Sequence, residues 1–357
     1  WSGTVMQWKR LTALVAAIAI SARPLVNTLL WLHTAPPDDE VGAIPVLSTE
    51  ELSSFVKGKR AILIGGTRGV GLGTAQALAA AGARVTVVGR DEGSGGSAAS
   101  KIRRRAASAS SSGATAEFVR GDVGTVCGAL DLVERLEERG ERYDLAVVSA
   151  AIFPDWTRPL RNEDGLDRSF AVAVVGRFLV YRNMHRFMND GARILNVMAS
   201  GHKATMAMKF DEDIATGDRN VTSLLEAMFT FGMGNEIMID SLFKYDENFA
   251  GKKKFTMVST HPGMIATDLH RGQGLAFDIF EYVMVLLAGI SEEEAGARQS
   301  SILVSEKLHP FGLTLVDHLG HGRVYDPIMA DLIDQKQDSL WVFLKMMERN
   351  HSCDKES

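Results

Sequence analysis

The chain has 357 residues, of which 46% are hydrophobic and 23% are charged, and its net charge at pH 7 is −5. This length suits one large α/β domain with extensions or two small domains, with ample apolar material for a core. The slightly acidic balance excludes the basic surface that nucleic acids require, so we expect no nucleic-acid partner.

The sequence holds two cysteines, Cys127 and Cys353, which lie far apart in the chain. Cys353 falls in a polar tail. From this spacing we predict neither a disulfide framework nor a cysteine-based metal site, and we predict no bound metal.

The N-terminal region is hydrophobic. Two apolar runs, 11–20 and 25–32, are separated by Arg23 and Pro24. A spanning helix needs about 20 apolar residues, which this segment approaches, but the polar interruption also fits an interfacial helix or an arm buried against protein. We predict membrane contact through residues 8–33.

The first residue is Trp1 rather than Met. We expect that a targeting peptide has been removed and that the protein belongs to an organelle; the other interpretation is a start inside a longer protein. Our first expectation is a membrane-associated mitochondrial protein, with the plastid and the endoplasmic reticulum as alternatives.

The chain divides into a hydrophobic arm and linker at 1–40, a main domain at 41–330, and a C-terminal helix with a polar tail at 331–357. The C-terminal helix is amphipathic, and its apolar face predicts core packing in preference to docking of a partner. The candidates for that face are Leu332, Leu340, Val342, Phe343 and Met346.

Strands and helices alternate throughout the main domain. Short apolar runs predict strands at 61–66, 84–90, 117–123, 143–151, 192–200 and 255–263, and the segments between them predict helices at 69–83, 101–108, 130–140, 166–188 and 224–243. Residues 91–100 (DEGSGGSAAS) are typical of a loop. The alternation predicts a Rossmann-type, doubly wound α/β fold, a parallel sheet with helices on both faces.

A glycine-rich turn, IGGTRGVG, follows the first strand and opens the first helix. Gly65, Gly69 and Gly71 allow the backbone to approach a pyrophosphate, and the helix N-terminus offers N–H groups to the anion. The second strand ends at Arg90, where an acid would bind ribose hydroxyls and a cation would meet a 2′-phosphate. Arg90 and Arg68 therefore predict NADP(H) over NAD(H), with Asp91 as a competing acid.

The order of the motifs resembles the short-chain dehydrogenase/reductase family, most of all its retinol-dehydrogenase branch, over about 59–325. The motifs are IGGTRGVG at 64–71, GDV at 121–123, VSAA at 148–151, DGLDRSFAVAVVGRFLV at 164–180, RILNVMASGHK at 193–203, FDED at 210–213, HPGMIATDL at 261–269 and SEEEAGA at 291–297. The resemblance implies a dinucleotide site formed by Gly65, Thr67, Arg68, Gly69, Val70, Gly71, Arg90, Asp122, Val123, Ala150, Pro262, Gly263 and Thr267.

The family's catalytic residues are replaced in this sequence. A tyrosine normally exchanges the proton, a lysine lowers the pKa of that tyrosine, a serine orients the substrate oxygen, and an asparagine completes a proton relay. The corresponding positions hold Phe231 for tyrosine, Asn235 for lysine, Ala199 for serine and Ala173 for asparagine. Neighbouring residues that could substitute are Ser200, His202 and Glu236.

We therefore predict a catalytically degenerate protein that keeps NADP(H) as a structural element and serves as an accessory or assembly subunit of an organellar membrane complex. The cofactor site could also be empty. The alternatives are a working NADP-dependent oxidoreductase for a lipophilic carbonyl or alcohol, with an unusual proton donor, and a module that senses NADP(H).

Overall fold

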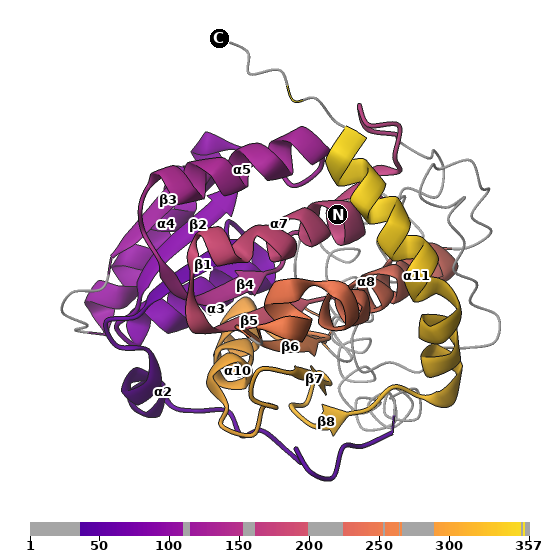
Figure 1. Cartoon of the computed structure of the whole chain (residues 1–357). Helices are drawn as coiled ribbons and strands as arrows, with labels where there is room; N and C mark the ends of the chain where they lie inside the picture. The colour runs from indigo at the N-terminus through magenta and orange to yellow at the C-terminus, as the bar shows by residue number, and fades with distance from the viewer. Residues whose placement is uncertain are drawn as a thin grey trace, which may run out of the picture.

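The computed structural model describes residues 36–109, 115–152, 161–198, 224–252, 254–263, 265, 289–350 and 353. Its centre is an eight-stranded sheet in the order β3-β2-β1-β4-β5-β6-β7-β8, and every pairing except β7 with β8 is parallel (Figure 1). The strands are β1 (Arg60–Ile64), β2 (Arg84–Gly89), β3 (Ala116–Arg120), β4 (Tyr143–Val148), β5 (Met188–Val197), β6 (Thr256–Thr260), β7 (Leu313–Val316) and β8 (Gly322–Arg323).

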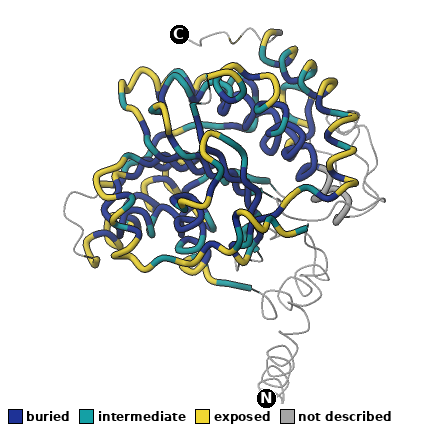
Figure 2. The backbone as a smooth tube through the Cα atoms, turned by 60° about the horizontal axis from the view of Figure 1, so that its bottom comes forward, coloured by how far each residue is buried: buried dark blue, intermediate teal, exposed yellow. Residues whose placement is uncertain are grey.

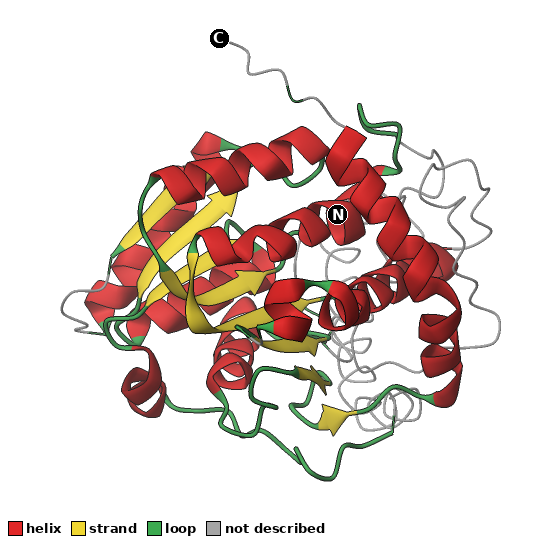
Figure 3. Cartoon of the chain, viewed as in Figure 1, coloured by secondary structure: helices red, strands yellow, loops and turns green. Residues whose placement is uncertain are grey.

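Helices cover both faces of the sheet, which confirms the predicted Rossmann-type fold (Figure 3). One apolar core lies between the sheet and α2 (Thr49–Val56), α3 (Gly69–Ala80), α4 (Glu92–Ser108) and α10 (Glu292–Val304). The other lies under α5 (Val126–Glu138), α7 (Arg177–Asn183), α8 (Leu224–Tyr245) and α11 (Pro327–Asn350). Because both faces of the central strands are buried, the strands read as continuous apolar runs such as Ala61–Ile64.

The predicted strands and most predicted helices lie where expected, but two segments differ. Residues 91–100 are not a loop: Asp91 caps the start of α4 by accepting a hydrogen bond from Ser94 N at 2.7 Å. A Cβ on Gly95 would lie 2.2 Å from the ring of Phe118, so this glycine lets α4 approach β3. The predicted helix at 166–188 is divided into α6 (Arg168–Phe170), the π-helix η1 (Ala171–Gly176), α7, and the 3₁₀-helix η2 (Met184–Arg186), after which β5 begins.

The two ends of the described chain are tied to the main fold. Residues 36–44 run beside β8, where Asp38 N donates to Gly322 O at 2.9 Å and Ile44 N donates to Gly320 O at 2.7 Å. Helix α11 packs on α8 and carries both buried and exposed residues (Figure 2). Leu340 is completely buried, while Val342 and Met346 remain 67% and 48% exposed. The prediction of core packing is therefore confirmed for one side of α11, whereas Val342 and Met346 were wrongly assigned to that side.

Cys127 and Cys353 form a disulfide, with a Cα–Cα distance of 5.4 Å. The prediction of no disulfide was wrong. The two residues are separated by 226 positions in sequence, but α11 carries the tail back across the molecule to the start of α5. Linear spacing could not reveal this approach.

No helix in the described part of the chain is long and apolar enough to cross a membrane. The segment 8–33, for which we predict membrane contact, lies outside the described residues. The described residues also contain no cluster of histidine, cysteine and acidic side chains suited to a metal ion.

Candidate functional site: the carboxyl edge of the sheet

Five loops that follow parallel strands meet at one edge of the sheet. They are Gly65–Arg68 after β1, Arg90 after β2, Asp122–Val123 after β3, Ser149–Ala150 after β4, and His261–Gly263 after β6. Strand β1 pairs with β2 on one side and with β4 on the other, so the direction of the strand order reverses between β1 and β4. In folds of this kind, ligands bind in the crevice at that reversal.

The glycine loop packs against the backbone of the β4 loop. Gly65 has a φ of +91°, and a Cβ there would lie 2.4 Å from Ala150 N. A Cβ on Gly71 would lie 2.4 Å from Gly65 O. These contacts fix a tight turn whose N–H groups open α3, which is the cradle that a pyrophosphate needs.

The N-terminus of α3 already contacts a carboxylate. Arg68 precedes the helix and, in the described part of the chain, makes no side-chain cap hydrogen bond. Instead Gly69 N donates to Glu292 Oε1 at 2.9 Å across 223 positions of sequence. We did not predict this contact, because no local pattern links α10 to the glycine loop.

The two predicted phosphate-binding arginines lie on neighbouring loops. Arg68 and Arg90 are both exposed, and Thr67 lies so close to the end of β2 that a Cβ on Gly89 would be 2.7 Å from Thr67 Cγ2. The competing acid, Asp91, is engaged as the cap of α4. Arg68 and Arg90 therefore lie on neighbouring loops after β1 and β2, at the carboxyl edge of the sheet.

The β3 loop is held by backbone contacts. Asp122 Oδ1 accepts a hydrogen bond from Gly124 N at 2.8 Å. A Cβ on Gly176 would lie 2.0 Å from Val123 O, so η1 packs directly against this loop. Asp122 and Val123 therefore lie at the carboxyl edge of the sheet, where the resemblance to the family predicts that the adenine would bind.

Helix α8 carries the replacements for tyrosine and lysine. Phe231 is 5% exposed and packs edge-on against Phe170, with ring centroids 6.2 Å apart. Asn235 is fully buried: its Nδ2 donates to Ala173 O at 2.7 Å, and its Oδ1 accepts from Asn196 Nδ2 at 2.9 Å. Position 231 thus offers no proton, and the amide at position 235 is engaged in the core.

A buried polar network surrounds Asn196 on β5. Asn196 Oδ1 accepts from Arg177 Nη1 and from Tyr181 OH, and its Nδ2 also donates to Ser259 Oγ at 2.8 Å. Ser259 Oγ in turn donates to Glu236 Oε1 at 2.9 Å, and Tyr325 OH donates to Glu236 Oε2 at 3.1 Å. Glu236, one of the predicted substitutes for the missing acid, is therefore a 5% exposed member of this network.

The network holds a buried cation beneath the site. Arg177 is 0% exposed and donates from Nη2 to Ala150 O and Val197 O, each at 2.9 Å. Burial lowers the pKa of Arg177, while Tyr181 and Glu236 oppose that shift. Burial raises the pKa of Tyr181, so this phenol is a poor acid at neutral pH. Arg177 and Asn196 were not predicted as site residues.

Two histidines lie close together at this edge, His261 in the loop after β6 and His318 in the loop after β7. Gly263 N donates to His261 Nδ1 at 3.1 Å, and the rings of His261 and His318 are 6.3 Å apart. Burial lowers the pKa of His318, with partial opposition from Asp317. Pro262 and Gly263 lie at this edge, whereas the predicted site residues Ala199, Ser200, His202 and Thr267 lie outside the described residues.

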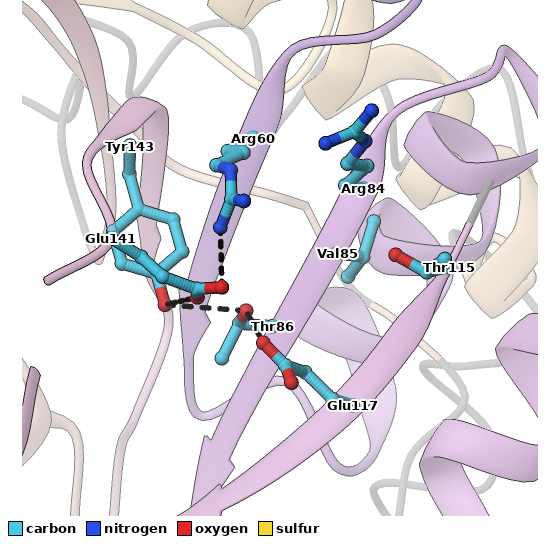
Figure 4. A pocket seen from close by; sticks show the side chains of 8 residues that line it. All are labelled: Arg60, Arg84, Val85, Thr86, Thr115, Glu117, Glu141 and Tyr143. Atoms are coloured by element: carbon cyan, nitrogen blue, oxygen red, sulfur yellow. Dashed lines mark hydrogen bonds and ion pairs between the residues drawn. The ribbon is translucent and has the colours of Figure 1, made fainter. Parts of the chain in front are cut away.

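A cavity of about 280 Å³ lies at the opposite, amino edge of the sheet (Figure 4). Its lining includes Arg60 at the start of β1 and Arg84 at the start of β2. Several of its polar groups are paired with one another: Arg60 binds Glu141, and Tyr143 OH donates to Thr86 Oγ1 at 3.3 Å. This cavity is far along the strands from the glycine loop and is no part of the dinucleotide edge.

Comparison with known proteins agrees with this geometry. Residues 59–209 match the family described as short chain dehydrogenase. This match and the curated relatives support a short-chain dehydrogenase/reductase. A short-chain dehydrogenase/reductase from Penicillium roqueforti, prx1, is 22% identical over 266 residues, which cover 70% of this chain and 73% of that protein. Versicolorin reductase stcU from Emericella nidulans is 26% identical over 212 residues, covering 59% and 71% of the two chains.

Solved structures of short-chain dehydrogenases share the fold of this chain. A short-chain dehydrogenase/reductase from Serratia marcescens has a TM-score of 0.53 at 20% identity and covers 74% of this chain and 98% of its own. A short chain dehydrogenase from Burkholderia cenocepacia, solved in complex with NADP, has the same TM-score at 21% identity and the same coverages. The retinol-dehydrogenase branch stays a prediction.

The residues of the carboxyl edge fit a dinucleotide. The backbone contacts of Gly65 and Gly71 leave no room for side chains, as a close approach to pyrophosphate demands, and Arg68 and Arg90 provide cations for a 2′-phosphate.

Proposed function

We propose that this short-chain dehydrogenase/reductase binds NADP(H) at the carboxyl edge of its sheet but does not turn it over by the family's usual mechanism. The observation that carries the proposal is the environment of Phe231 and Asn235 on α8. A phenyl ring stands at the position of the proton donor, and a buried amide bound to Ala173 O stands at the position of the lysine.

The expected loss of rate follows from general acid catalysis. Removal of one positioned acid typically reduces a rate by about 10²–10⁴-fold. Here the cation that would lower the pKa of that acid is absent from position 235 as well, and position 173 is alanine. When bound, the dinucleotide would supply hydride chemistry, whereas Gly65, Gly71, Arg68 and Arg90 would only hold it in place.

Retention of the nucleotide then serves stability. A ligand that binds only the folded state adds about 2.7 kcal/mol to the free energy of unfolding at 100 times its Kd. The test is to denature the purified protein, identify released nucleotide by chromatography, and titrate emptied protein with NADPH and NADH. Binding of NADPH in preference to NADH supports the proposal, and a protein that neither releases nucleotide nor responds to NADPH contradicts it.

We further propose an accessory role in a membrane complex of an organelle, in contact with other protein subunits. The hydrophobic segment 8–33 and the replaced catalytic positions support this role. Native membranes extracted in mild detergent and separated on a non-denaturing gel test it. Migration with a large assembly is expected, and migration only as a monomer or dimer would count against an accessory subunit.

A second candidate is a working NADP-dependent oxidoreductase for a lipophilic carbonyl or alcohol with an unorthodox acid. The relatives favour it, since versicolorin reductase stcU is named for a reduction. Ser200 and His202 are the candidate donors. Turnover that is lost in His202→Ala would establish this alternative over the first.

A further inference from the structure

We infer that Glu292 sets the affinity of the glycine loop for the dinucleotide by placing a competing negative charge on the anion-binding end of α3. This inference rests on the proposed dinucleotide site and concerns its regulation by a residue outside the loop. The contact that carries it is the 2.9 Å hydrogen bond from Gly69 N to Glu292 Oε1.

The position of Glu292 is fixed by the closest helix–helix contact at the site. Helices α3 and α10 meet through two glycines: a Cβ on Gly73 would lie 2.0 Å from Glu292 O, and a Cβ on Gly296 would lie 2.1 Å from Gly73 C. The two N-termini therefore lie together, since Gly69 and Gly73 on α3 face Glu292 and Gly296 on α10. The backbone of Glu292 therefore cannot shift away from α3 without separating the two helices, and its carboxylate stays within reach of Gly69 N.

The carboxylate occupies the same kind of position that a phosphate seeks. An anion at a helix N-terminus is stabilised by the first free N–H groups and by the positive end of the helix dipole. Gly69 is the first residue of α3, and its N–H donates to Glu292, whereas Arg68 provides no side-chain cap. Glu292 thus supports the nucleotide-free helix, and it repels the two negative charges of a pyrophosphate that binds to the next N–H groups.

The neighbouring acids differ in what they contact. Glu293 is exposed and forms an ion pair with Arg105 on α4. Glu294 lies near Arg298 at 3.4 Å, one turn further along α10. Within the described residues, Glu292 is the member of this acidic run that accepts a hydrogen bond from the glycine loop. Glu293→Gln is therefore a matched control for the loss of one negative charge.

The test compares wild-type protein, Glu292→Gln and Glu293→Gln in titrations with NADPH and with inorganic pyrophosphate. Glutamine keeps an acceptor for Gly69 N and removes the charge, so Glu292→Gln should bind both ligands about two- to fivefold more tightly, and Glu293→Gln should match wild type. The thermal midpoint of each nucleotide-free protein, read by circular dichroism, verifies that the variants are folded.

The outcomes separate the two claims. Unchanged or weaker NADPH binding by Glu292→Gln, with normal binding by wild type, would overturn the role of Glu292 and leave the proposed function intact. An equal gain in Glu293→Gln would also overturn it, because a general change in net charge would then explain the effect. Absence of NADPH binding in all three proteins would overturn the proposed function and this inference with it.

Discussion

Asn235 Nδ2 donates a hydrogen bond to Ala173 O at 2.7 Å, which joins the two positions where the family has its lysine and its asparagine. The same amide accepts from Asn196, so position 235 is part of a core network that extends to Arg177 and Glu236. Asn235, which stands where the family has its lysine, therefore has a structural role: it provides hydrogen-bond partners for the buried polar groups of Ala173 and Asn196.

Replacement of Asn235 by alanine should reduce the free energy of unfolding by about 1–3 kcal/mol, because Asn196 and Ala173 would each lose a buried partner. Urea denaturation measures this. Asn189→Ala is the control, since Asn189 is half-buried and makes a 2.8 Å bond to Asp144. If both variants lost the same free energy of unfolding, the buried network around Asn235 would contribute no more to stability than the half-buried bond of Asn189.

Substitution of Gly65 by alanine should destabilise the protein by about 2–5 kcal/mol and weaken NADPH binding, because φ is +91° and the new Cβ would lie 2.4 Å from Ala150 N. Gly140→Ala separates the two causes: Gly140 has a φ of +65° but nothing within 4 Å of a Cβ. The control should lose only about 1–2 kcal/mol and bind NADPH normally. Normal NADPH affinity in Gly65→Ala would argue against the glycine cradle.

The Cys127–Cys353 disulfide should stabilise the oxidised protein by about 2–4 kcal/mol, since it closes a loop that spans most of the chain. Cys127→Ser and Cys353→Ser should lose the same amount, and a reductant should bring wild type to their level. Denaturation curves with and without reductant test this. Two free thiols in the purified protein under non-reducing conditions would contradict the cross-link.

The half-buried imidazole of His318 should make the protein less stable in mild acid. Burial lowers the pKa of His318 in the folded state, whereas the unfolded chain has the ordinary value of about 6.5. The stability is therefore fully present above about pH 6.5 and is lost as the pH falls toward the folded-state pKa.

Denaturation at a series of pH values from 5 to 8 tests this, with His318→Gln expected to show a shallower loss of stability below neutrality. His309→Gln is the control, because the side chain of His309 is 42% exposed. If His318→Gln and wild type lost stability in parallel, other groups would account for the acid sensitivity.

The sequence predicted those features that depend on residues close together in the chain. Apolar runs such as AILI and the turn IGGTRGVG identified β1, α3 and the edge where a dinucleotide would lie. The glycines at 93, 95 and 96 misled the prediction, because Gly95 serves close packing against Phe118 inside α4 and does not mark a loop. Contacts between distant segments were beyond reach: Gly69 with Glu292, Cys127 with Cys353, and Arg177 with Val197 depend on the folded arrangement of strands.

The central claim is that NADPH binds without being consumed. The most direct measurement follows NADPH absorbance in protein that is first shown by titration to be saturated with NADPH, in the presence of a panel of aldehydes, ketones and quinones. We predict saturable binding and oxidation no faster than in the protein-free control. Oxidation that scales with protein concentration and saturates with one carbonyl substrate would contradict the claim and require a proton donor other than position 231.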